Sequence, residues 1–112
     1  MDKIKLSVDF LQKPIFKNPK TWQVFCFCLF KASHAPTREE VKSGHGIESI
    51  LVHRGQFVFG RERVARELKV SRTIVYSSIK KLEKAGYITL DTHRFYTLIT
   101  VCDYAKYWIL YG

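Results

Sequence analysis

The sequence is short of acidic residues. Its 112 residues include 10 Asp and Glu against 19 Lys and Arg, which gives a formal net charge of +9. Such a balance favours a polyanionic partner, either nucleic acid or an acidic membrane surface. The excess is not confined to one tail, because residues 60–94 carry nine basic and four acidic side chains.

Cysteines are few and odd in number. Cys26 and Cys28 lie inside an apolar run and Cys102 stands alone, which argues against a disulfide framework and indicates reduced thiols in the cytosol. The four histidines have no metal-ligand spacing with these cysteines. The sequence also lacks a glycine-rich phosphate loop and a nucleophile motif. We therefore expect no enzyme activity, no metal site and no cofactor.

Long hydrophobic runs are missing as well. The first ten residues contain no continuous apolar core of signal-peptide length. The most apolar segment, residues 22–30, is less than half the ~20 residues that a membrane-spanning helix needs. The sequence therefore predicts a cytoplasmic protein without a membrane partner.

What the sequence does contain is a helix-turn-helix pattern over residues 60–87. Apolar residues recur at helical spacing on both sides of a break at residues 69–71. In the second helix Ser71 is a favourable N-cap and Gly86 a favourable residue just past the end. Its inward stripe consists of Val75, Ser78, Ile79 and Leu82.

The opposite face of that second helix is rich in hydroxyl and basic groups. No carboxylate interrupts it in the helical projection, and such a strip on a protruding helix suits the DNA major groove. A solvated helix face is the alternative interpretation. The strip consists of Thr73, Tyr76, Ser77, Lys80 and Lys84, with Arg72 at its N-terminal tip.

Less regular segments precede the motif. Residues 1–19 predict a short edge strand over Ile4, Leu6 and Val8, or a poorly ordered arm. Residues 20–34 predict a core helix buried around most of its girth, with a buried strand as the alternative. Residues 35–46 predict a polar loop in which Thr37 and Glu40 cap one helical turn, and residues 50–52 and 56–59 predict extended segments around Gly55.

After Gly86 the apolar period changes from helical to two. Residues 87–90 and 95–101 predict two strands joined by a loop at residues 91–94, and a helix-turn-helix followed at once by a hairpin is a winged helix. In this wing His93 and Arg94 are placed to meet a phosphate or a minor groove, the alternative being a solvated turn. Residues 103–112 carry a helical aromatic stripe that predicts core or subunit interface rather than base stacking: Tyr104, Tyr107, Trp108 and Tyr111.

The expected fold is therefore α+β: a winged helix-turn-helix with a three-helix core, a β-hairpin wing and a short C-terminal helix. We divide the chain into an N-terminal arm (1–19), a winged-helix domain (20–102) and a C-terminal aromatic helix or interface segment (103–112). The DNA-binding residues expected from this pattern are Ser71, Arg72, Thr73, Tyr76, Ser77, Lys80, Lys84 and Arg94.

Several stretches resemble a known family. Residues 14–34, 53–88 and 94–108 are similar to the N-terminal winged-helix domain of bacteriophage and prophage replication-initiation proteins, the DnaD-like replisome organisers. The most telling parts are Arg54-Gly55-Gln56 and residues 99–104. The resemblance implies binding to double-stranded DNA at an origin or fork, recruitment of primosome or helicase-loader proteins, and homo-oligomer formation.

In that resemblance the recognition helix falls on residues 71–85 and the wing on residues 91–94. Two features depart from it. Lys69 stands where such turns often have Gly, and it is expected to adopt a left-handed conformation. Family members also commonly carry a further C-terminal helical region, so we expect either a domain of a longer protein or a stand-alone variant. The competing functions are a protein-interaction winged helix for oligomerisation or replisome assembly, and a small transcriptional regulator.

Overall fold

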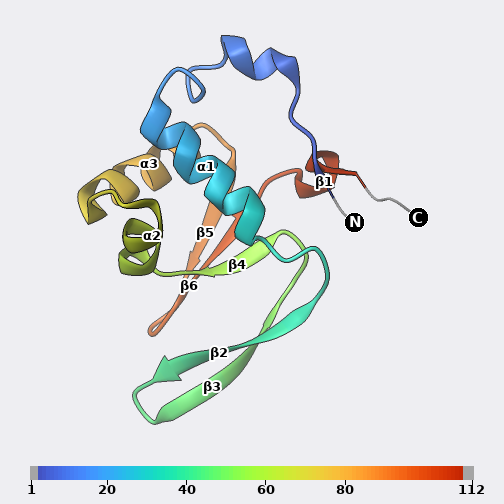
Figure 1. Cartoon of the computed structure of the whole chain (residues 1–112). Coiled ribbons are helices and arrows are strands. Elements are labelled where there is room, and N and C mark those ends of the chain that lie inside the picture. The colour runs from blue at the N-terminus through green and yellow to red at the C-terminus, as the bar shows by residue number, and fades with distance from the viewer. Residues whose placement is uncertain (1–2, 110–112) are drawn as a thin grey trace.

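The structure is a computed structural model that describes residues 3–109. It is a mixed α+β fold. Within the described residues, three α-helices pack against a three-stranded sheet, and a separate two-stranded hairpin projects away from them (Figure 1). In chain order the main elements are α1 (Pro19–Lys31), β2 (Thr37–Ser43), β3 (Gly46–Val52), β4 (Gln56–Phe59), α2 (Arg61–Leu68), α3 (Arg72–Lys84), β5 (Ile88–Thr92) and β6 (Thr97–Val101).

α1 is the central helix, as the sequence predicts, and the strand alternative for this segment is wrong. Asn18 caps it by accepting a hydrogen bond from the Thr21 N–H, and Pro19 occupies the first turn, where a missing N–H costs nothing. Phe25 and Leu29 are fully buried. Burial around most of the girth is confirmed, since Val24, Phe27 and Cys28 are buried as well, whereas Phe30 on the remaining side is 69% exposed.

α3 packs across α1 and closes the core. The inward stripe predicted for α3 is confirmed, since Val75, Ile79 and Leu82 are all buried at 2% exposure or less. Ser78 is buried too, and its Oγ accepts a hydrogen bond from Thr21 Oγ1 of α1 at 3.5 Å. This polar pair satisfies two hydroxyl groups that would otherwise be stranded in the core.

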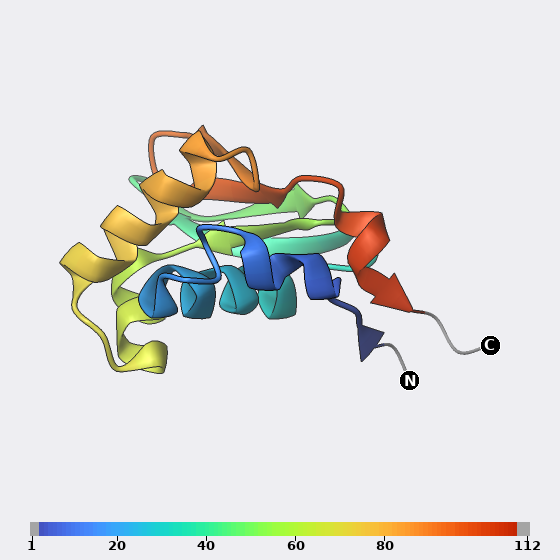
Figure 2. The ribbon, with the colours of Figure 1, turned by 90° about the horizontal axis from the view of Figure 1, so that it is seen from above.

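The three-stranded sheet has the order β4-β6-β5 and is antiparallel throughout. Ile99 of the central strand pairs with Phe57 on one side and Leu90 on the other. It is fully buried, because α1 covers this face of the sheet (Figure 2). The expected extended segment at residues 56–59 and the turn at Gly55, where φ is +85°, are confirmed.

The predicted polar loop at residues 35–46 is wrong. β2 and β3 pair in register from Thr37↔Val52 to Ser43↔Gly46, so Thr37 and Glu40 cap no helical turn. The hairpin satisfies its backbone by strand pairing, while Val41 and Val52 supply its buried side chains. Most other positions of both strands are exposed, so the sequence shows only a weak alternation of apolar and polar residues. Such a weak alternation does not distinguish a strand from a loop.

The two end segments lie side by side. β1 (Lys3–Ile4) pairs with β7 (Trp108–Ile109). The 3₁₀ helix η1 (Val8–Gln12) follows β1, and the 3₁₀ helix η2 (Tyr104–Tyr107) precedes β7. The edge strand expected over residues 4–8 is therefore shorter than predicted. The short C-terminal helix reduces to one 3₁₀ turn, because Asp103 is left-handed at φ 53° and Trp108 is already extended.

The aromatic stripe at the C-terminal end belongs to the core as far as it is described. Tyr104 and Tyr107 are 6% and 3% exposed, so neither is available for base stacking. The N-terminal segment packs in the same cluster, since the centroid of the Phe10 ring lies 5.2 Å from that of Trp22 and 6.4 Å from that of Tyr107. Tyr111 lies outside the described residues.

Two further expectations concern the cysteines, which were expected to be reduced, and the absence of a membrane-spanning segment. Cys26, Cys28 and Cys102 are free cysteines. Burial, with a smaller contribution from neighbouring Cys26, raises the pKa of Cys28 from its ordinary 9.0 to about 12. Within the described residues, none of the helices combines the length and the apolar character that crossing a membrane requires.

The buried thiol makes stability depend on alkaline pH. Cys28 is neutral in the folded state up to about pH 12, whereas in the unfolded chain it ionises near its ordinary pKa. A raised folded-state pKa contributes stability that is complete below pH 9 and is lost as the pH rises toward 12. We expect the free energy of unfolding to fall over this range, and less steeply in Cys28→Ala, as measured by urea unfolding under reducing conditions. The half-buried Cys102→Ala is the control, and an unchanged slope in Cys28→Ala would contradict the argument.

Candidate nucleic-acid interface

The turn between α2 and α3 is built by backbone hydrogen bonds and one side-chain cap. Lys69 ends α2 in the left-handed conformation, with φ 56° and ψ 44°, as the sequence predicts. The Val70 N–H then donates to the Ala65 carbonyl at 3.0 Å, which closes the last turn of α2. Ser71 Oγ accepts from the Ile74 N–H at 3.1 Å and starts α3. Three residues therefore suffice to reverse direction between the helices.

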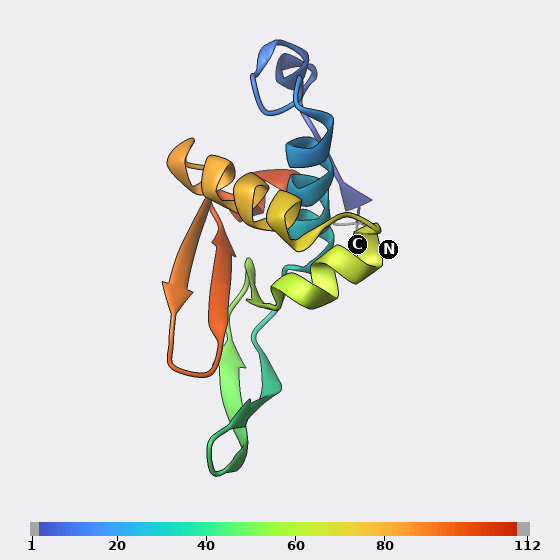
Figure 3. The same cartoon turned by 90° about the vertical axis from the view of Figure 1, so that its left-hand side faces the viewer.

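The expected binding strip of α3 is on the surface. α2, α3 and the turns of both hairpins lie on the same side of the molecule, with the hairpin turns below the helices in the view of Figure 3. Because Val75, Ile79 and Leu82 point into the core, the residues on the other side of the helix are held outward. The exposed residues include each predicted contact of this segment: Ser71, Arg72, Thr73, Tyr76, Ser77, Lys80 and Lys84.

Tyr76 contacts two of the basic side chains on this surface. Its ring is 51% exposed, and two cations lie against it, the Arg61 guanidinium at 5.7 Å from the ring centroid and the Lys80 ammonium at 5.6 Å. Exposed cation–π contacts of this kind stabilise by about 0.5–1 kcal/mol each. Arg61 begins α2, so the contact also joins the two helices of the motif. The sequence analysis did not include Arg61, because only the tertiary structure brings it to Tyr76.

The strip is not free of acidic neighbours, contrary to the expectation from the helical projection. Arg72 Nη1 lies 2.8 Å from Glu62 Oε1 of α2, and Lys80 Nζ lies 3.6 Å from Glu83 Oε1 one turn along α3. A helical projection of α3 alone does not include Glu62, which belongs to α2. Glu83 is not part of the strip, but its side chain reaches Lys80 from position i+3.

A groove separates the strip from the start of α1. It has a volume of about 300 Å³ and carries two lysines, Lys20 from α1 and Lys81 from α3, that the sequence analysis did not select. Lys81 lies to one side of the strip in projection, and Lys20 is far away in sequence. Their proximity follows from the packing of α1 on α3. Hydroxyl and amide groups and one apolar side chain, Ile74, complete the lining, which consists of Asn18, Lys20, Thr21, Thr73, Ile74, Ser77, Ser78 and Lys81.

The turn of the β5–β6 hairpin lies two residues later than predicted. β5 continues to Thr92 and the turn comprises residues 93–96, closed by the His93 N–H donating to the Tyr96 carbonyl at 2.8 Å. His93 stacks on Tyr96 with ring centroids 4.4 Å apart, and its Nε2 lies 2.9 Å from Asp91 Oδ2. Arg94 is exposed at the tip, and its guanidinium lies 5.2 Å from the ring centroid of Phe95.

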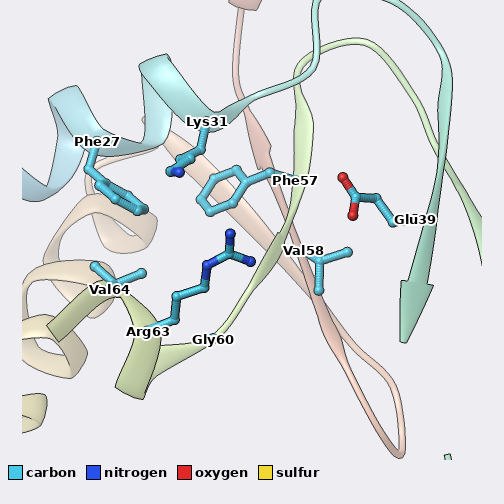
Figure 4. A pocket seen from close by; sticks show the side chains of 8 residues that line it. All are labelled: Phe27, Lys31, Glu39, Phe57, Val58, Gly60, Arg63 and Val64. Atoms are coloured by element: carbon cyan, nitrogen blue, oxygen red, sulfur yellow. The ribbon is translucent and has the colours of Figure 1, made fainter. Parts of the chain in front are cut away.

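A second pocket, of about 240 Å³, lies between α1, α2 and β4 (Figure 4). Its base is apolar, with Phe27, Phe57 and Val64 facing one another, and Lys31 and Arg63 stand at its rim. Both cations lie 3.4 Å from Glu67, whose single carboxylate balances one of the two positive charges, and Glu39 of β2 also lines the pocket. Within the described residues, no group of three or more His, Cys, Asp and Glu side chains could hold a metal ion.

Comparison of the chain with protein-family models, with curated proteins and with solved structures gives no match. The function is therefore argued from the geometry of this surface.

The left-handed turn residue provides a test of the motif. A non-glycine residue in this conformation is strained by about 1–2 kcal/mol. Substitution by glycine relieves this strain in the folded state, but glycine also gives the unfolded chain more conformational freedom, which offsets part of the gain. We expect Lys69→Gly to raise the free energy of unfolding by about 0.5–1 kcal/mol in urea titrations. Lys69→Ala removes the same charge and keeps the β-carbon, so it is expected to bring no gain. Equal effects of the two variants would show that the charge, and not the backbone, matters here.

Proposed function

We propose that the chain is a winged helix that binds double-stranded DNA, with α3 in the major groove and the β5–β6 hairpin as the wing on the backbone. The order of elements supports this proposal. α2 and α3 form a helix-turn-helix, the β5–β6 hairpin follows at once, and β4 completes the sheet beside β6. The major groove is about 12 Å wide and admits one helix, and such a helix contacts base edges with its N-terminal residues.

The observation that carries the proposal is the exposed face of α3. It presents hydroxyl groups at Thr73 and Ser77, a half-exposed Tyr76, and the cations of Lys80 and Lys84. Thr73, Tyr76 and Ser77 are the candidates for reading bases, because their hydroxyls donate and accept hydrogen bonds. The lysines supply salt-dependent affinity for phosphates that tolerates any sequence.

The two ion pairs on this face are compatible with DNA binding. Arg72 and its partner Glu62 are 61% and 77% exposed, and Lys80 and Glu83 are 52% and 39% exposed. Exposed pairs of this kind contribute only about 0–1 kcal/mol. Because these pairs are exposed and weak, a DNA phosphate, which accepts the same charge-assisted hydrogen bonds, replaces such a carboxylate at little cost.

The proposed biological role is that of a DNA-binding domain in a phage-type replication-initiation protein, with primosome or helicase-loader proteins as further partners. The support is the resemblance beyond the helix-turn-helix. The segments that carry it meet in space, since Tyr104 packs against Gly55 and the Arg54 guanidinium lies 5.8 Å from the Tyr104 ring centroid. The Tyr104 hydroxyl donates to the Ala32 carbonyl at 3.2 Å, which joins these segments to the end of α1.

A second candidate is a protein-interaction winged helix for oligomerisation or replisome assembly. The observation that favours it is the exposed apolar surface of the N-terminal segment, where Leu6, Val8 and Leu11 are 42%, 79% and 55% exposed. Beside them Phe10 and Tyr107 line a groove of about 450 Å³. Apolar side chains gathered in this way mark interaction sites.

DNA binding is tested by fluorescence anisotropy of labelled duplex over a salt series. Each lysine that neutralises a phosphate adds about 0.9 to the log–log salt slope through counterion release. We therefore expect Lys80→Ala/Lys84→Ala to weaken binding and to reduce the slope by about two. The matched control is Lys5→Ala/Lys106→Ala, which removes two exposed lysines beside the N-terminal groove. Equal effects of the two double variants would reduce the interaction to net charge, and no duplex binding at all would favour the second candidate.

The groove between α1 and α3 makes a separate prediction. If Lys20 and Lys81 hold the DNA backbone beside α3, Lys20→Ala/Lys81→Ala lowers the salt slope by about two and weakens binding to specific and unrelated duplexes alike. Ser77→Ala, by contrast, is expected to reduce discrimination between sequences while leaving the slope unchanged. An unchanged salt slope in Lys20→Ala/Lys81→Ala would show that these two lysines do not contact the DNA backbone.

A further inference from the structure

The β2–β3 hairpin stands outside the elements that a winged helix needs, yet its turn touches the proposed wing. The ring of Phe95, in the β5–β6 turn, lies against Gly44 in the β2–β3 turn. Its Cζ is 3.2 Å and its Cε1 3.6 Å from the position that a β-carbon at residue 44 would occupy. Both turns reach the same side of the molecule as α2 and α3 (Figures 1 and 3).

The Phe95 ring also contacts the Arg94 side chain. The Arg94 guanidinium lies 5.2 Å from the centroid of the Phe95 ring, which is itself 45% exposed. Within residues 4–108, no carboxylate oxygen lies within ion-pair distance of Arg94. A chain of contacts therefore runs from the backbone of Gly44 through the Phe95 ring to an exposed cation without an acidic partner.

The other residues of the β5–β6 turn are held from within. His93 stacks on Tyr96 and lies 2.9 Å from Asp91, so these groups stay on their own hairpin. Phe95, by contrast, reaches the neighbouring hairpin. β4 pairs with β6 and supports the strands of the β5–β6 hairpin, but the turn at residues 93–96 lies beyond that pairing, so an external contact there restricts the motion of the turn.

The charge of the β2–β3 hairpin argues against a direct DNA contact along its length. Its strands carry three acidic residues, Glu39, Glu40 and Glu48, against two basic ones, Arg38 and Lys42. An acidic excess repels phosphates. The hairpin is therefore better suited to support the neighbouring turn than to bind DNA itself.

We propose that the β2–β3 hairpin is a brace that positions Arg94 on a DNA phosphate through the ring of Phe95. Arg94 makes the contact, and Phe95 and Gly44 are positioning residues. The inference rests on the proposed DNA-binding function and deepens it, because it assigns a role to the one hairpin that the helix-turn-helix and its wing leave unexplained.

The test is a double-mutant cycle on duplex binding. Removal of one phosphate contact lowers the salt slope by about 0.9, which corresponds to about a five-fold drop in affinity near 0.15 M salt. We expect this effect for Arg94→Ala and a smaller drop for Phe95→Ala, since the charge remains but is no longer held. Phe95→Tyr retains the ring and is expected to retain the affinity. In the Arg94→Ala background, Phe95→Ala weakens binding no further, because the two residues act as one unit.

The brace itself is tested at Gly44. Gly44→Val displaces the Phe95 ring and is expected to reproduce Phe95→Ala, again without further effect in the Arg94→Ala background. Ser49→Val places the same side chain on the exposed outer part of the hairpin and is expected to leave binding unchanged. Thermal unfolding establishes that each variant is folded.

The outcomes separate the brace from DNA binding as such. If Lys80→Ala/Lys84→Ala weakens binding while Phe95→Ala and Gly44→Val leave it unchanged, or add fully to Arg94→Ala, the brace is overturned and DNA binding by α3 stands. If duplex binding is absent altogether, both proposals fall. Weaker binding by Gly44→Val that disappears in the Arg94→Ala background supports the brace.

Discussion

The packing of α1 against α3 is the constraint on which the rest of the structure depends. Phe25 and Leu29 of α1 meet the stripe of Val75, Ile79 and Leu82 on α3, and burying such side chains stabilises by roughly 1.5–3 kcal/mol each. Because that stripe occupies one side of α3, the other side must face solvent. The same packing brings Lys20 beside Lys81. The character of the exposed surface is therefore a consequence of which residues of α3 are apolar.

The parts of the fold that sequence reasoning predicts are those determined by neighbours along the chain. The Ser71 cap and the positive φ of Gly86 are local backbone requirements that their residue types indicate, and the left-handed conformation of Lys69 follows from its position in the turn between the two helices. The inward stripe of α3 follows from helical periodicity alone. For the same reason the exposed residues of the strip could be named in advance.

What could not be predicted depends on contacts between distant segments. Glu62 reaches Arg72 from another helix, and Arg61 reaches Tyr76 in the same way. Of the β2–β3 hairpin only the extended segment at residues 50–52 was predicted, because most of its other side chains are exposed and mix charged with apolar residues, as in the cross-strand pair of Lys42 and Ile47. Its stability comes from strand pairing and a few contacts with the body, which leave little trace in composition. The turn of the other hairpin was misplaced by two residues, since Asp91 and Thr92 extend β5 by pairing with Leu98 and Thr97.

The pairing of β1 with β7 has a consequence for the geometry of the whole molecule. Ile4 lies opposite Trp108, and the Lys5 N–H donates to the Tyr107 carbonyl at 2.8 Å, so the chain returns to the point from which it set out. That point lies across the molecule from α2 and α3 (Figure 2). Lys5 and Lys106 flank this pairing and are both exposed, so they offer two attachment points at the same corner. A fluorophore or a surface coupled to either lysine would leave α3 and both hairpin turns facing the solution.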